Sequence, residues 1–89
     1  MKDEIGFTTI EKDQRSSLLV GKLLEVWEAS VRASHHFLTE KDIIRLSPQA
    51  ECALRYIETL CVVQDSGCPV GFMGVQNRKI EMLFLHPDY

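Results

Sequence analysis

The last ten residues of the sequence read Ile80-Glu81-Met82-Leu83-Phe84-Leu85-His86-Pro87-Asp88-Tyr89. The apolar run predicts a strand over Lys79–Leu85, and Pro87-Asp88 predicts a turn directly after it. Successive side chains of a strand point to opposite faces. Apolar residues here fall on both faces, and Glu81 is the only carboxylate among them. The pattern therefore predicts a strand that is covered on both sides.

Two further strands are predicted before this one, over Leu60–Gln64 and Pro69–Gln76. Asp65-Ser66-Gly67-Cys68 forms the first turn, with glycine where a positive φ costs little, and Asn77-Arg78 forms the second. Such short connections join antiparallel neighbours, so the three strands should form a meander.

The first two thirds of the chain predict one strand followed by helices. Ile5–Ile10 is rich in β-branched and aromatic residues. Ser16 or Ser17 can cap a helix that runs to about Ala33, and Thr39 with Asp42 resembles a capping box that starts a short second helix. Ser47-Pro48 reads as the start of a third helical segment that ends near Thr59.

Composition excludes several classes of protein. The 89 residues suffice for one domain, and 45% hydrophobic with 26% charged residues is typical of a globular chain. The net charge of −3 without a basic stripe argues against a nucleic-acid partner. No apolar run is long enough for a membrane span and no secretory signal precedes the first strand, so a cytoplasmic location is expected.

The three cysteines, Cys52, Cys61 and Cys68, form no C-x-x-C pair. They are expected to be reduced, although spacing alone allows a disulfide between Cys61 and Cys68.

The predicted sheet has two apolar faces, whereas all of the predicted helices come from one block that can cover only one face. A missing length of chain, a second subunit or a ligand should therefore cover the other face. The alternative is that the helices divide between the two faces.

Three motifs, in the same order and spacing, resemble the GNAT N-acetyltransferase family. They are Val26-Trp27-Glu28-Ala29-Ser30-Val31-Arg32-Ala33-Ser34-His35-His36-Phe37-Leu38, Asp65-Ser66-Gly67-Cys68-Pro69-Val70-Gly71-Phe72 and the final stretch Ile80–Tyr89. The resemblance covers the whole chain and implies an α+β domain, residues 1–89, in the order β-α-α-β-β-β with a four-stranded, mainly antiparallel sheet. It implies the N-terminal half of that family's domain, a truncated form of the fold.

The resemblance also implies a site for acetyl-CoA and an amine acceptor. In the family a bulge in the fourth strand leaves backbone groups that bind the pantetheine and polarise the thioester. By position these are the main-chain amides around Leu83, Phe84 and Leu85. Glu81 is the candidate general base that takes the amine proton, with a plain surface carboxylate at a sheet edge as the alternative. No metal is implied.

His35 and His36 are expected to border the acceptor cleft, with Trp27 and Phe37 as substrate-contacting walls or core residues. Because adjacent side chains point in different directions, at most one of the two histidines should line the site. Imidazole titrates near neutral pH, so either one is a candidate for proton transfer.

In the family, an Arg/Gln-x-x-Gly-x-Gly loop that binds the cofactor's pyrophosphate follows this strand, and the 89 residues contain no such loop. We therefore expect weak or absent acetyl-CoA binding and no measurable transfer by this chain alone. The alternative function is a non-enzymatic interaction module that forms a homodimer, or binds a partner, through the uncovered sheet face. The acceptor, a small molecule or a protein, is not indicated.

Overall fold

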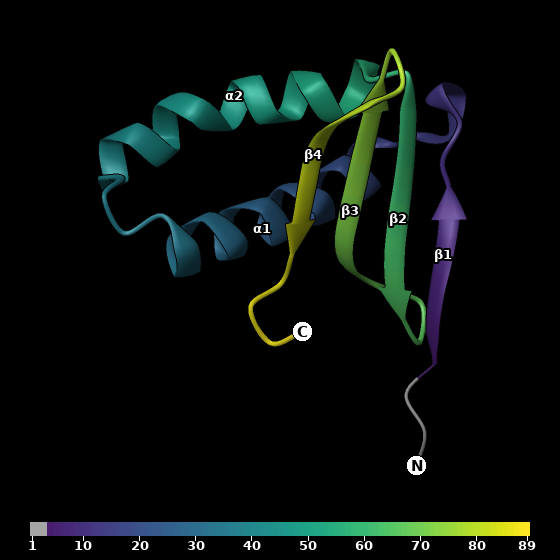
Figure 1. The fold of residues 1–89 in the computed structure, drawn as a ribbon, viewed down its shortest axis with the longest axis horizontal. Coiled ribbons are helices and arrows are strands. Elements are labelled where there is room, and N and C mark those ends of the chain that lie inside the picture. The colour runs from purple at the N-terminus through teal and green to yellow at the C-terminus, as the bar shows by residue number, and fades with distance from the viewer. Residues whose placement is uncertain (1–3) are drawn as a thin grey trace.

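A computed structural model describes residues 4–89 of the chain, and its elements follow the predicted order. They are β1 (Ile5–Thr9), the 3-10 turn η1 (Lys12–Gln14), α1 (Ser17–Ser34), α2 (Glu40–Tyr56), β2 (Thr59–Asp65), β3 (Cys68–Gln76) and β4 (Lys79–Leu85). The predicted α+β fold of the form β-α-α-β-β-β is confirmed (Figure 1).

The four strands form one sheet in the order β1-β2-β3-β4, and every neighbouring pair is antiparallel. Two-residue loops close both hairpins, and all four loop residues have positive φ: Ser66, Gly67, Asn77 and Arg78. Such loops match the right-handed twist of the flanking strands. Both predicted reversals are therefore confirmed.

Side-chain caps begin both helices. The Ser16 hydroxyl accepts from the Leu19 backbone N–H at 3.1 Å, which places the start of α1 where the sequence predicted it. At α2, Thr39 and Asp42 form the predicted capping box, with hydrogen bonds of 2.9 and 3.2 Å. The Thr39 backbone N–H donates to the Asp42 carboxylate and lowers the pKa of Asp42.

The separate third helix predicted at Ser47-Pro48 is wrong, because α2 runs through Pro48 without a break. Proline removes one helical hydrogen bond, which predicts an interruption. The apolar side chains before and after it, Ile43, Leu46, Ala50 and Leu54, stay at three- and four-residue steps and all pack in or against one core. Continuous packing of this stripe holds the helix together across the proline.

Both helices cover the same face of the sheet (Figure 1). Leu60, Val62 and Phe72 point to that face and are at most 1% exposed, packed with Leu23 and Leu54 of the helices. Side chains on the opposite face are exposed on the edge strands, among them Phe7 at 71% and Leu83 at 65%, and are half-buried on β2 and β3. The prediction of one-sided cover is confirmed, and a division of helices between the two faces is not observed.

Two other sequence features have a structural outcome. All three cysteines are free thiols, and Cys61 pairs with Met73 across the sheet whereas Cys68 pairs with Asp65. Within residues 4–89, neither helix has the length and apolar character that a bilayer crossing needs.

Candidate functional site

Strand β4 lies at one edge of the sheet and carries a bulge. It pairs with β3 from Gly71↔Leu85 to Gly74↔Met82, and the register then shifts so that Val75 is opposite Ile80. Glu81 is the extra residue at that shift. A bulge breaks the local ladder and redirects a side chain, and bulges are common next to active sites. Here it sets the position of the one carboxylate in the strand.

The main-chain groups of β4 alternate between β3 and the open edge of the sheet. The His86 N–H donates to the Val70 carbonyl at 2.8 Å, which makes that pair a hydrogen-bonded one. Because hydrogen-bonded and non-hydrogen-bonded pairs alternate in an antiparallel ladder, the main-chain N–H and C=O of Phe84 also point towards β3. The Phe84 carbonyl oxygen agrees with this, since it lies only 3.0 Å from where a Cβ on Gly71 of β3 would be. The N–H and C=O groups of Leu83 and Leu85 face the open edge.

A cleft of about 370 Å³ lies between β4 and the two helices. Trp27, Val31 and His35 line it from α1 and its C-terminal cap, Leu46, Gln49 and Ala50 from α2, and Glu81, Met82 and Phe84 from β4. The fold thus brings together Trp27, His35, Glu81 and Phe84, which the sequence had proposed as site residues. Its walls are mainly apolar, and its polar side-chain groups are one carboxylate, one amide, one imidazole and the indole N–H of Trp27.

Two of the proposed substrate contacts lie outside this cleft. His36 is exposed on the connection between the helices, and Phe37 is 78% exposed, with its ring edge-on to His35 at 5.7 Å between centroids. The side chains of Leu83 and Leu85 point to the opposite sheet face. Gln49, a polar cleft residue, was not proposed. The only signal for it was its three-residue step from Leu46, which does not distinguish a cleft wall from a surface position.

The contacts of His35 favour one placement of the proton on its neutral ring. The Ser34 hydroxyl donates to the Ser30 carbonyl at 2.7 Å and lies 3.0 Å from His35 Nδ1. With the one hydroxyl proton given to Ser30, Nδ1–H is the donor that satisfies the second contact. The neutral ring then keeps Nε2 as a proton acceptor.

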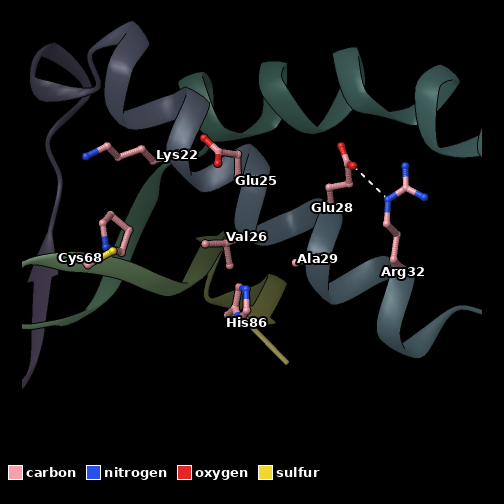
Figure 2. A pocket seen from close by; sticks show the side chains of 9 residues that line it. Lys22, Glu25, Val26, Glu28, Ala29, Arg32, Cys68 and His86 are labelled. Carbon is pink, nitrogen blue, oxygen red and sulfur yellow. Dashed lines mark hydrogen bonds and ion pairs between the residues drawn. The ribbon is translucent and has the colours of Figure 1, made fainter. Parts of the chain in front are cut away.

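A second hollow, of about 620 Å³, lies between α1 and the end of β4 (Figure 2). It is lined by Lys22, Glu25, Val26, Glu28, Ala29, Arg32, Cys68, Pro69 and His86. The Arg32 guanidinium pairs with Glu28 at 3.0 Å and with Glu40 at 2.6 Å, and these bonds hold its pKa above the ordinary value. Lys22 extends away from His86 in Figure 2. Balanced charges make this hollow a poor site for a pyrophosphate.

The segment after β4 folds back onto the β2–β3 hairpin. The Tyr89 N–H donates to the His86 carbonyl, and the Tyr89 hydroxyl donates to the Asp65 carboxylate. The Asp88 backbone N–H donates to His86 Nδ1 at 3.2 Å. These contacts give the predicted turn a defined direction at the end of the strand. Within residues 4–89, no three His, Cys, Asp or Glu side chains gather in the manner of a metal site.

No protein-family model matches the chain. The peptidyl-lysine N-acetyltransferase YjaB of Salmonella typhimurium is 33% identical over 67 residues, which cover 75% of this chain and 46% of the relative. The solution structure of apo-form YjaB from Escherichia coli superimposes with a TM-score of 0.74 and 26% identity, over 96% of this chain and 54% of that one. The chain therefore spans about half the length of the relatives it matches.

Proposed function

Because this chain is a relative of the GNAT N-acetyltransferases over about half of their length, we propose that it carries the thioester-binding strand and the acceptor cleft of such an enzyme. One observation carries the proposal: the edge strand β4 presents outward main-chain groups at Leu83 and Leu85, and the same strand places Glu81 in a cleft. A donor group and an acceptor amine would meet along this strand.

The outward N–H groups of Leu83 and Leu85 are suited to the amide and thioester groups of the acetyl-CoA arm. Fixed backbone donors stabilise negative charge that develops on a carbonyl oxygen without reorganising during the reaction. Phe84 contributes its side chain to the cleft wall, and its main chain is used by β3. The 89 residues fit the thioester end of acetyl-CoA, which supplies the acetyl group, and not its pyrophosphate.

The acceptor is proposed to be a primary amine on an apolar stem, as in a lysine side chain. Trp27, Val31 and Met82 offer an apolar wall for methylene groups, and the Glu81 carboxylate attracts an ammonium ion. Glu81 would accept the proton that the amine must lose before attack, directly or through water, and His35 Nε2 is the second acceptor at the same cleft. The name of the Salmonella relative, a peptidyl-lysine N-acetyltransferase, supports a lysine acceptor.

The thioester part of the proposal is tested at the main chain of β4. In Leu83→Pro the outward N–H is lost without loss of a bond to β3, and an edge strand tolerates such a proline. In a titration with acetyl-CoA followed by amide NMR, the wild type should respond at Leu83 and Leu85. Leu83→Pro should bind roughly fivefold more weakly, the loss of about one hydrogen bond.

Leu83→Ala is the matched control, because it removes the side chain and keeps the N–H, and it should bind like the wild type. Equal affinity of all three proteins, or responses confined to residues away from β4, would contradict the assignment of this edge to the thioester.

The acceptor part is tested separately with Nα-acetyl-lysine amide as the probe. Glu81→Gln removes the cleft charge with little change of shape and should weaken the probe's binding roughly twofold to fivefold, the range of a partly exposed ion pair. Glu25→Gln, which makes the same change on α1 outside the cleft, should leave binding unchanged. If both variants bind the probe alike, Glu81 does not contact the acceptor.

A further inference from the structure

The sheet face opposite the helices, here called the open face, carries apolar side chains on all four strands, with Thr9, Thr59 and Asp65 as polar residues at its ends. Strand register places Ile5 and Phe7 of β1, Val63 of β2, Met73 of β3, and Leu83 and Leu85 of β4 on it. None of these side chains is charged. The carboxylate at its corner, Asp65, is held by the Tyr89 hydroxyl. Monomeric proteins seldom expose a continuous apolar surface of this kind.

The accessible surface area of the whole chain is also larger than expected for a monomer of its mass. Its accessible surface is 6126 Å². A folded monomer of 10.2 kDa is expected to expose roughly 5,300 Å². The chain as a whole thus exposes about 800 Å² more than a monomer of its mass, and Ile5, Phe7 and Leu83 of the open face, each at least half exposed, contribute part of this excess. One partner of an interface of standard size buries about 800 Å².

We propose that the 89-residue chain forms a twofold homodimer in which the open faces of two copies pack against each other. A twofold interface brings the same surface together with itself, so charges on it would repel their own copies. The open face lacks charged side chains at its centre, so two copies can meet there without repulsion between like charges. Two sheets packed in this way lie about 10 Å apart, which leaves room for Phe7 and Leu83 to interdigitate.

The dimer is compatible with the proposed acetyltransferase site and does not depend on it. The cleft with Glu81 lies on the helix-covered face, away from the proposed interface. The outward groups of Leu83 and Leu85 point along the sheet edge, in the plane of the strands, so face-to-face packing leaves them accessible. The particle mass therefore tests the dimer, and ligand binding tests the acetyltransferase site, each independently of the other.

The experiment is a mass measurement by light scattering and sedimentation, from about 1 µM to about 1 mM chain. The expected result is a particle with twice the mass of one chain and a dissociation constant of about 10 µM or tighter, as interfaces of this size give. A monomer over the whole range would overturn the proposal, and so would an open series of larger oligomers. In the monomeric case the open face would fit a different polypeptide.

Variants locate the interface. Leu83→Lys and Phe7→Lys each place a charge in the middle of the open face, at side chains 65% and 71% exposed in the single chain, so the fold should survive. Each should weaken the dimer roughly 100-fold or more, as expected for a charge buried without a partner. Circular dichroism checks the fold of both.

Leu18→Lys is the matched control, since Leu18 is 72% exposed but belongs to α1, outside the open face. It should leave the dimer intact. A dimer that survives both Leu83→Lys and Phe7→Lys, or one that Leu18→Lys disrupts equally, would contradict packing through the open face.

Discussion

Arg15 is a charged side chain that the fold encloses almost completely, with 7% of its surface exposed. Its guanidinium donates to the main-chain carbonyls of Ile10, Leu54, Arg55 and Ile57, at 2.8 to 3.2 Å. Three of these belong to the last turn and the cap of α2, where carbonyls lack helical partners and a positive charge is favourable. Burial lowers the pKa of Arg15 from its ordinary value. One side chain thus ties the start of α1 to the end of α2.

Among substitutions of polar residues, replacement of Arg15 should cause the largest loss of folding stability. Arg15→Met keeps the apolar stem and leaves buried carbonyls without donors, so the free energy of unfolding should fall by about 3 kcal/mol. Arg45→Ala, which removes an exposed pair with Asp42, should cost under about 0.5 kcal/mol. Urea denaturation compares the two. A loss below about 1 kcal/mol for Arg15→Met would show that water replaces the guanidinium.

Among the elements, α2 contains the clearest conflict between local preference and packing. Pro48 lies in the helix interior, where its missing N–H and its ring disfavour an α-helix. The core contacts of Ile43 and Leu54 on either side hold the helix continuous. The element therefore carries a local cost that the tertiary structure offsets.

Pro48→Ala should raise the free energy of unfolding by roughly 1 to 3 kcal/mol, because alanine restores a helical hydrogen bond and removes the ring clash. Thermal and urea unfolding measure this, and Gln49→Ala, at the next and exposed position, is the control with an expected change under about 0.5 kcal/mol. A destabilised Pro48→Ala would mean that a proline-dependent bend of α2 is required for its fit to the sheet.

At the scale of the whole molecule, residues 4–89 form one sheet with one layer of helices. The proposed thioester edge lies on the sheet, and the proposed acceptor cleft lies between the sheet and the helices. In the GNAT family a Gly-rich loop binds the pyrophosphate of the cofactor, and the 89-residue sequence does not contain this loop. The second hollow does not replace it, because its arginine is already bound by two carboxylates.

We therefore expect the 89-residue chain to bind acetyl-CoA with a dissociation constant of about 1 mM or weaker, that is, with about 4 kcal/mol or less. The few outward backbone groups of β4 do little more than offset the cost of association. No acetyl transfer to a lysine substrate should be detected. Isothermal titration is the measurement, with the longer Escherichia coli relative as the comparison. Submicromolar affinity of this chain would refute the expectation.

The sequence by itself determined the order of the strands and the two main helices, the two hairpins, the caps at Ser16 and Thr39, and the relation to the GNAT family. These depend on interactions within a few residues, such as positive φ at Gly67 or the capping box at Thr39. It also predicted that one sheet face would lack a cover, because apolar residues fall on both faces of the strands that became β3 and β4 and all the helices come from one block of the sequence.

Only the tertiary structure decided which proposed residues share a site. His35 and Glu81 are distant in sequence, and they meet because α1 lies across the edge strand. His36 and Phe37, beside His35 in sequence, lie outside the cleft. The pairing with β3 placed Glu81 in a β-bulge. It also directed the main-chain groups of Phe84 towards β3 and those of Leu83 and Leu85 towards the open edge of the sheet. Register and long-range packing depend on contacts between distant segments, so no local pattern specifies them.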